Sequence, residues 1–338
     1  MAALTVCRYR NRPRFGPVRH FTIASQRADL ALPDLHLPKL SQASPRLLFW
    51  GPTLIWASTW HVILYQLVEV AAVSAVAWRF ALSSILLFGI AAFRGESWAL
   101  PGRLHPWLAL AGVVQFGLNY LGVYEAERYI PSGLVAVLFS LMVFGNAATG
   151  AWFFGQPVTR RFAASAVAGV AGVTLIFWPE VLAAGARPQA GLGLALGLGA
   201  VVCACTGNAL TLMLSRRGVA LVPMLAWCMA YGALGLLGAA GVSGSGWQVG
   251  HTVAWWGSLV YLAAVGSVLA FLLYFKLVQR EGPGRAALTG VLVPVIALAV
   301  SAAFEGWRPS PASWAGMALC LGSVYVATRP ARPAPRAD

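Results

Sequence analysis

The chain has 338 residues, of which 59% are hydrophobic and only 10% are charged. Soluble domains carry about 25% charged residues, so this composition excludes a soluble globular protein. The mean hydropathy of +0.72 indicates a membrane protein instead. The net charge of +14 arises mainly in the tails and in loops on one side of the predicted spans, so it does not indicate a nucleic-acid-binding surface.

Residues 1–44 form a basic segment that contains four prolines. They include no apolar stretch of about 7–15 residues, which a secretory signal requires. Two interpretations remain open, a disordered tail near anionic lipid head groups and an organellar transit peptide. The composition favours the disordered tail. A second short tail is predicted at residues 329–338.

Ten apolar runs of about 17–25 residues follow, each long enough to cross about 30 Å of hydrocarbon as a helix. They are Pro45–Leu67, Val70–Phe93, Pro106–Tyr124, Ser132–Phe154, Phe162–Phe177, Ala190–Leu214, Leu221–Val242, Ala254–Phe275, Arg285–Phe304 and Pro311–Ala327. The fifth run is the shortest, and charged residues bracket it on both sides.

The same pattern of two apolar runs joined by a Gly/Pro connection occurs twice. Its glycines Gly133 and Gly284 lie 151 residues apart. Five spans is an odd number, so a second copy must cross the membrane in the opposite orientation. We therefore predict an all-α integral membrane protein, with ten transmembrane helices as two inverted five-helix repeats at 45–178 and 190–328.

The positions of Lys and Arg predict that both termini are cytoplasmic. Nine of these residues fall in predicted inner loops and three in outer loops, and cytoplasmic loops collect positive charge. Five acidic residues fall at the predicted outer side: Glu69, Glu125, Glu127, Glu180 and Glu305.

Motifs for catalysis are absent from the sequence. Aspartate occurs only at Asp29, Asp34 and Asp338, outside every predicted span, and neither lysine follows a phosphate-binding glycine loop. The His-Glu-x-x-His zinc motif is also missing. We therefore expect no enzyme activity, no cofactor, no metal site and no nucleic-acid partner.

Arg79 is the deepest charge in the predicted spans. It lies nine residues into the second span, about 14 Å along a helix that rises 1.5 Å per residue. Ionisable residues in spans line pathways or serve as internal clamps. Two interpretations therefore stay open: a pathway cation that meets a substrate carboxylate, and a structural arginine bonded to helix-end carbonyls or to Glu69 or Glu125.

Further polar and aromatic residues are candidates for the substrate pathway. His61 could relay a proton or fill a packing position. Trp56 and Trp60 share one helix face at i,i+4 spacing, where they could wall a pocket or face lipid. The remaining candidates carry uncharged hydrogen-bonding groups: Asn119, Tyr120, Tyr124, Asn146, Thr206 and Asn208.

Seven short motifs follow one another in a characteristic order over about residues 47–328. They are Trp50-Gly51, Ala77-Trp78-Arg79-Phe80, Asn119-Tyr120-Leu121, Ser132-Gly133-Leu134-Val135-Ala136, Leu292-Val293-Pro294-Val295, Phe304-Glu305-Gly306 and Trp314-Ala315-Gly316. Each motif alone is weak, but their order and doubled spacing resemble the drug/metabolite transporter superfamily, in its EamA-like branch of ten-helix permeases.

The resemblance implies a secondary carrier that exports small metabolites, such as amino acids, by alternating access. Relatives often have proline in the fourth span, where this chain has Val143 or Phe144, and Glu after the glycine that ends that span, where it has Gln156. The second copy keeps both features as Pro294 and Glu305. We therefore predict that a helix break near the pathway survives only in the ninth span.

Arg79 and the aromatic residues favour an anionic, zwitterionic or aromatic solute over a simple cation. The expected partners are this solute and the lipid bilayer, and a monomer and a homodimer both stay open. The expected location is a bacterial inner (plasma) membrane. The alternative is a nontransporting component, such as a receptor or assembly subunit, which the short outer loops disfavour.

Overall fold

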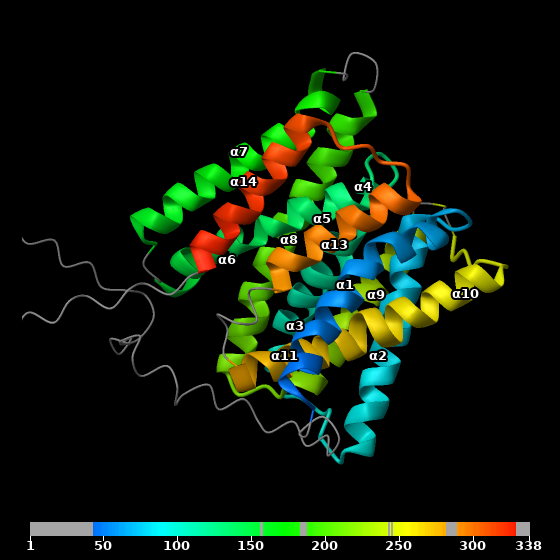
Figure 1. Cartoon of the computed structure of the whole chain (residues 1–338). Coiled ribbons are helices and arrows are strands. Elements are labelled where there is room, and N and C mark those ends of the chain that lie inside the picture. The colour runs from blue at the N-terminus through cyan, green and yellow to red at the C-terminus, as the bar shows by residue number, and fades with distance from the viewer. Residues whose placement is uncertain are drawn as a thin grey trace, which may run out of the picture.

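The computed structural model describes residues 43–155, 158–182, 188–242, 244, 246–281 and 289–328. The predicted tails therefore lie outside the described residues, apart from 43–44. The described chain is all-α (Figure 1). In chain order its elements are α1 Pro45–Leu67, α2 Ala72–Phe93, η2 Gly102–Leu104, α3 His105–Gly112, η3 Val113–Leu118, α4 Asn119–Ala126, α5 Ser132–Ser140, α6 Met142–Phe154, α7 Arg160–Leu182, α8 Pro188–Arg216, α9 Leu221–Val242, α10 Val253–Val260, η5 Tyr261–Leu269, α11 Ala270–Glu281, α13 Thr289–Phe304 and α14 Pro311–Thr328.

Most of these helices have membrane-spanning character. Within the described residues, seven helical stretches are long and apolar enough to cross a bilayer, and two shorter apolar helices follow at Leu292–Phe304 and Pro311–Ala327. This confirms an all-α membrane protein. Several helices extend beyond the predicted apolar runs, because helices continue into the polar ends of a span. The predicted Phe162–Phe177 run becomes the 23-residue α7, whose first turn is capped by the Thr159 hydroxyl.

The prediction of a helix break at Pro294 is wrong, because α13 continues through this residue. Proline removes one N–H donor from the helix, a loss that a membrane bundle tolerates when neighbouring groups satisfy the freed carbonyl. The interruption lies instead in the fourth predicted span, at Leu141 between α5 and α6. Just before it, the Ser140 hydroxyl donates to the Val137 carbonyl at 2.6 Å, a local bond that competes with the helical backbone pattern.

The contacts between helices keep the same pattern when the two halves of the chain are exchanged. Three contacts join elements at matching positions, namely α2 with α9, α5 with α13 and α7 with α14. In addition, α1 packs on α10, η5 and α11, and its counterpart α8 packs on α3, η3 and α4. Figure 1 shows α7 and α14 side by side along one edge of the bundle.

Glycines allow two helix pairs, α7 with α14 and α3 with α9, to approach until their backbones touch. A Cβ atom on Gly316 of α14 would lie 2.5 Å from the carbonyl oxygen of Gly172 on α7. Between α3 and α9, a Cβ atom on Gly232 would lie 2.8 Å from the carbonyl oxygen of Gly112. Small residues at such crossings let membrane helices gain close van der Waals contact.

We expect Gly316→Ala to lower the melting temperature of the purified protein. The added methyl group would also lie 2.8 Å from the backbone nitrogen of Ile176, so α7 and α14 would have to separate, and overpacking of this kind costs about 1–3 kcal/mol. Gly322→Ala on the same helix is the control, because nothing lies within 4 Å of its Cβ position. Thermal unfolding of both variants in one detergent measures the difference, and equal melting temperatures would contradict the close packing.

Candidate functional site

A cavity of about 440 Å³ lies between the two halves of the chain. Pockets of about 300–1,000 Å³ accommodate small organic molecules. The first half lines it with α1, α2, η3, α4, α5 and α6, and the second half with α8, α11 and α13. Among the residues proposed from sequence, eight line this cavity: Trp56, Trp60, Arg79, Asn119, Tyr120, Asn146, Asn208 and Pro294.

One wall of the cavity is aromatic. The Trp56 ring lies 5.6 Å from Phe271 and 5.1 Å from Tyr274, measured between ring centroids. The Trp60 ring lies 5.1 Å from Phe139. These contacts connect α1 to α11 of the other half and to α5, at separations typical of edge-to-face aromatic pairs. The wall therefore offers flat apolar surfaces to a bound solute.

The polar part of the cavity lining is a row of side-chain amides. Gln115 donates from Nε2 to Asn208 Oδ1 at 3.4 Å, and Asn208 donates from Nδ2 to Asn146 Oδ1 at 3.2 Å. Asn119 donates to the backbone carbonyl of Gln115 at 3.0 Å. The side-chain oxygens of Gln115 and Asn119 are buried and have no hydrogen-bond partner in the described part of the chain. Such acceptors can be satisfied by N–H or O–H groups of a solute.

Gln115 was not predicted as a site residue. The available signal was one amide in an otherwise apolar run. Its orientation depends on the π-helical segment η3, which brings Gln115 into the cavity lining together with Asn119.

Arg79 is only 1% exposed and is held by uncharged groups. Its Nε donates to Ser267 Oγ at 3.2 Å, and its Nη1 donates to the Tyr124 hydroxyl at 3.4 Å. The guanidinium carbon lies 4.7 Å from the centroid of the Tyr120 ring, within cation–π distance. Tyr124 itself donates to Gln66 at 2.8 Å and lies behind the cavity lining.

No carboxylate forms an ion pair with Arg79 within the described residues. The two acids considered from the sequence have other partners. Glu69 accepts backbone N–H groups from His251 and Thr252, and Glu125 pairs with Arg128 at 3.4 Å. The buried cation is therefore positioned by the protein but not neutralised by these acids.

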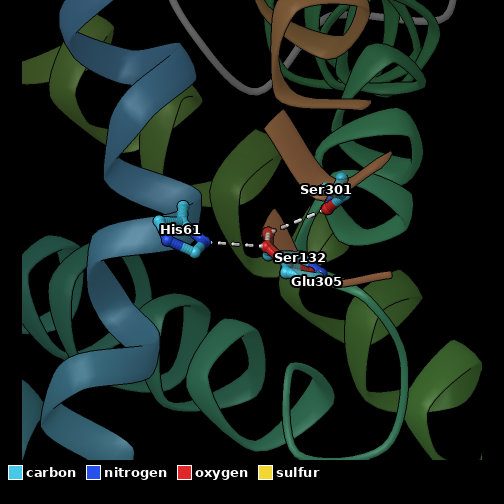
Figure 2. Close-up of polar contacts among 5 residues, drawn as sticks. His61, Ser132, Ser301 and Glu305 are labelled. Atoms are coloured by element: carbon cyan, nitrogen blue, oxygen red, sulfur yellow. Dashed lines mark hydrogen bonds and ion pairs between the residues drawn. The ribbon is translucent and has the colours of Figure 1, made fainter. Parts of the chain in front are cut away.

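A second polar network lies outside the cavity lining, around Glu305 (Figure 2). Its Oε2 accepts the Ser132 backbone N–H at 3.0 Å, and its Oε1 accepts the Ser132 hydroxyl and lies 3.2 Å from Nδ1 of His61. Ser301 accepts the N–H of Gly133 at 2.8 Å. Ser132 and Gly133 begin α5, so these side chains satisfy N–H groups that a helix start leaves unpaired. The network joins α1, α5 and α13.

The network also determines the charge of Glu305. Burial raises the pKa of this carboxyl, but the hydrogen bonds from the Ser132 side chain and backbone, together with those from His61 and Ser301, outweigh burial and lower the pKa below its ordinary value.

Thr206, which was a candidate for the substrate pathway, does not line the cavity. Its hydroxyl donates to the Val202 carbonyl of its own helix at 2.9 Å.

Comparison with known proteins places this architecture in a family. The sequence profile of the EamA-like transporter family matches residues 45–178 and 191–329. The chain belongs to this family. An uncharacterized transporter from Synechocystis is 29% identical over 234 residues, which cover 65% of this chain and 70% of that protein. Protein PecM from Dickeya dadantii is 25% identical over 224 residues, covering 65% of this chain and 72% of PecM.

Two further comparisons extend the likeness. A protein of Salmonella typhimurium described as a probable amino-acid metabolite efflux pump is 25% identical over 208 residues, covering 58% of this EamA-like transporter and 67% of that protein. A solved crystal structure superposes with a TM-score of 0.60 at 17% identity, covering 84% of this chain and 96% of that chain. The structural likeness supports the fold.

In this EamA-like transporter, we expect Glu305→Ala to destabilise the protein by about 2–3 kcal/mol, because hydrogen bonds to charged groups contribute about 1.5–3 kcal/mol. Glu125→Ala is the control, since its exposed pair with Arg128 should contribute about 0–1 kcal/mol. Because the folded-state pKa of Glu305 lies below the ordinary 4.5, its contribution is complete above that pH and disappears at lower pH. Unfolding measured across acidic and neutral pH tests this, and a difference between wild type and Glu305→Ala that grows on acidification would contradict it.

Proposed function

We propose that this EamA-like transporter is a secondary transporter that exports small metabolites, such as amino acids or related solutes, by alternating access between two inverted five-helix repeats. The observation that carries the proposal is the cavity itself, because its lining is divided between the two halves of the chain. The exchange pattern of helix contacts supports the inverted repeat. A rocking motion of one half against the other would open such a cavity to either side.

The chemistry of the cavity supports a solute that combines polar and apolar parts. Arg79 offers a positive charge that no described carboxylate pairs with, so it can attract a carboxylate of the solute. The unpaired oxygens of Gln115 and Asn119 accept hydrogen bonds, as an ammonium or amide group would supply. The rings of Trp56 and Trp60 can cover an apolar side chain. The Salmonella relative described as a probable amino-acid metabolite efflux pump agrees with this class.

The positions of the polar groups along α13 support a cavity that is open toward the cytoplasm. Thr289 and Gly290, at the predicted cytoplasmic end of α13, belong to the lining. Glu305 follows the other end and links to Ser132 and His61. We infer that this network closes the predicted outer side, with both termini cytoplasmic, and that its bonds break when the cavity opens outward.

Arg79→Ala should reduce transport about ten- to a hundredfold while membrane abundance stays near normal, because a charge-assisted hydrogen bond contributes about 1.5–3 kcal/mol. Arg79→Lys should recover only part of the activity, since an ammonium cannot reproduce the planar guanidinium. The measurement is metabolite-resolved efflux and uptake in a deletion strain that expresses each variant, normalised to membrane protein.

Two other outcomes would change this interpretation of Arg79. Normal transport by Arg79→Ala would eliminate the pathway role, and low abundance of that variant would favour a structural clamp. If neither deletion nor overexpression of the wild type alters any metabolite, a nontransporting role is favoured.

The proposed topology predicts that Gly244→Cys and Arg216→Cys are labelled from opposite sides of the membrane. Gly244 follows α9 and Arg216 ends α8, so one membrane crossing through α9 separates them. An impermeant thiol reagent added to intact cells should label Gly244→Cys alone, and permeabilisation should expose Arg216→Cys. A variant that lacks the native cysteines provides the background, and labelling of both sites in intact cells would refute the topology.

A further inference from the structure

Glu127 is a buried acid with no described partner. It forms the C-cap of α4 and is 7% exposed. Both of its carboxyl oxygens are buried, and neither has a hydrogen-bond partner among the described residues. Buried polar groups are nearly always paired in folded proteins, so a carboxyl group in this setting requires an explanation.

The surroundings of Glu127 favour its neutral form. An ionised carboxylate that is buried without hydrogen bonds is strongly unfavourable, and the group instead takes up a proton. Its position adds to this effect, because the C-terminal end of a helix carries partial negative charge. Glu305 has the opposite setting, since it accepts the Ser132 N–H at the start of α5. The two acids therefore lie near helix ends of opposite polarity.

The charged groups that shift the pKa of Glu127 lie on other elements, and its sequence neighbours Glu125 and Arg128 pair with each other. Burial raises the pKa of Glu127 well above its ordinary value, the Glu305 carboxylate raises it further, and the Arg79 guanidinium opposes both. Its own helix contributes the hydroxyl of Tyr124, which bonds to Arg79, and His61 of α1 contacts Glu305. Of the other elements packed on α4, η3 and the first part of α8 (residues 190–200) include no ionisable side chain, and neither do residues 132–140 of α5.

We propose that Glu127 is a proton-binding site of this transporter, and that its protonation is linked to the charge on Arg79. With the proton bound, Glu127 is neutral and the Arg79 charge remains available to a carboxylate of the solute. When Glu127 releases its proton to water, the new carboxylate competes with that solute for the attraction of Arg79. The role in transport rests on the proposed function, whereas the proton site itself does not.

The internal repeat supports a role beyond packing. At the 151-residue spacing of the two copies, the counterpart of Glu127 is Val278. The corresponding helix of the second copy, α11, therefore forms with an apolar residue at this position. An acid appears only in the half that also contributes Arg79.

The proton site can be tested without a substrate, by infrared difference spectroscopy of the full-length protein in lipid vesicles. Wild type should show the carbonyl band of a protonated carboxyl group at neutral pH. Glu127→Gln should lose this band, and Glu125→Gln should keep it, because Glu125 is an acid of the same helix paired with Arg128. A wild type without the band, or a band that persists in Glu127→Gln, would overturn the assignment.

Two neighbouring substitutions test the linkage in a chain that retains Glu127. Arg79→Gln removes a cation that stabilises the carboxylate, so the midpoint of the band's pH titration should rise. Glu305→Gln removes a negative charge that disfavours the carboxylate, so the midpoint should fall. A change of about one pH unit corresponds to a tenfold change in proton affinity. Shifts in the same direction, or no shift in either variant, would refute the linkage.

The role in transport has a separate readout. Wild-type efflux, measured in the strains described above, should vary with external pH, and efflux by Glu127→Gln should not. Glu125→Gln should keep the wild-type pH profile. Wild-type efflux that is independent of pH would refute the coupling and leave the proposed function standing. Absence of efflux together with an intact infrared band would refute the proposed function and the coupling, but not the proton site.

Discussion

Arg79 carries a permanent positive charge into the interior of the helix bundle, where a charge without compensation is strongly unfavourable. The structure holds the guanidinium with the hydroxyls of Ser267 and Tyr124 and with the face of the Tyr120 ring. These groups orient the charge without cancelling it. A fixed ion pair would have satisfied the arginine and left it little affinity for an anionic ligand. Because these partners are neutral, the same arginine can be held in place by the protein and still attract an anionic ligand.

The backbone around Arg79 is adapted in both halves of the chain. The π-helical segments η3 and η5 occupy matching positions, since Val113–Leu118 corresponds to residues 264–269 at the 151-residue spacing. A π segment has a wider turn than an α-helix and often lies at functional sites. In η3 it carries Gln115 of the cavity lining. In η5 it lets Ser267 donate to the carbonyl of Leu262 at 2.9 Å while accepting from Arg79.

Regular periodicity explains which parts of the site could be predicted from sequence. Trp56 and Trp60 line the cavity together because i,i+4 spacing places both on one face of α1. Asn119 and Tyr120 were found because polar groups are conspicuous in an apolar span. Gln115 was missed, because its direction depends on a π segment that the 3.6-residue period does not reveal.

The helix break was predicted from the helix-breaking tendency of proline alone, and the structure places it at another residue. Proline predicted it at Pro294, whereas α13 continues through this residue and a local hydrogen bond of Ser140 precedes the break at Leu141. Glu127 was grouped with the acids of the outer loops for a similar reason. A sequence shows how far an acid lies from the end of a span, but it does not show that other helices cover it.

Glu305 and Glu127 illustrate how helix ends of opposite polarity favour different charge states of the same chemical group. Glu305 accepts the backbone N–H and the hydroxyl of Ser132 at the start of α5, so its ionised form is stabilised and can hold α1, α5 and α13 together. Glu127 ends α4, where the backbone offers carbonyl oxygens, so its ionised form gains nothing from the helix. One acid is thereby suited to a constant charge and the other to a charge that changes. Because the Glu305 carboxylate and the Arg79 guanidinium both affect the proton affinity of Glu127, a change of contacts at Glu305 when the cavity opens would alter that affinity. Opening of the outer side and release of the proton would then be coupled through electrostatics alone.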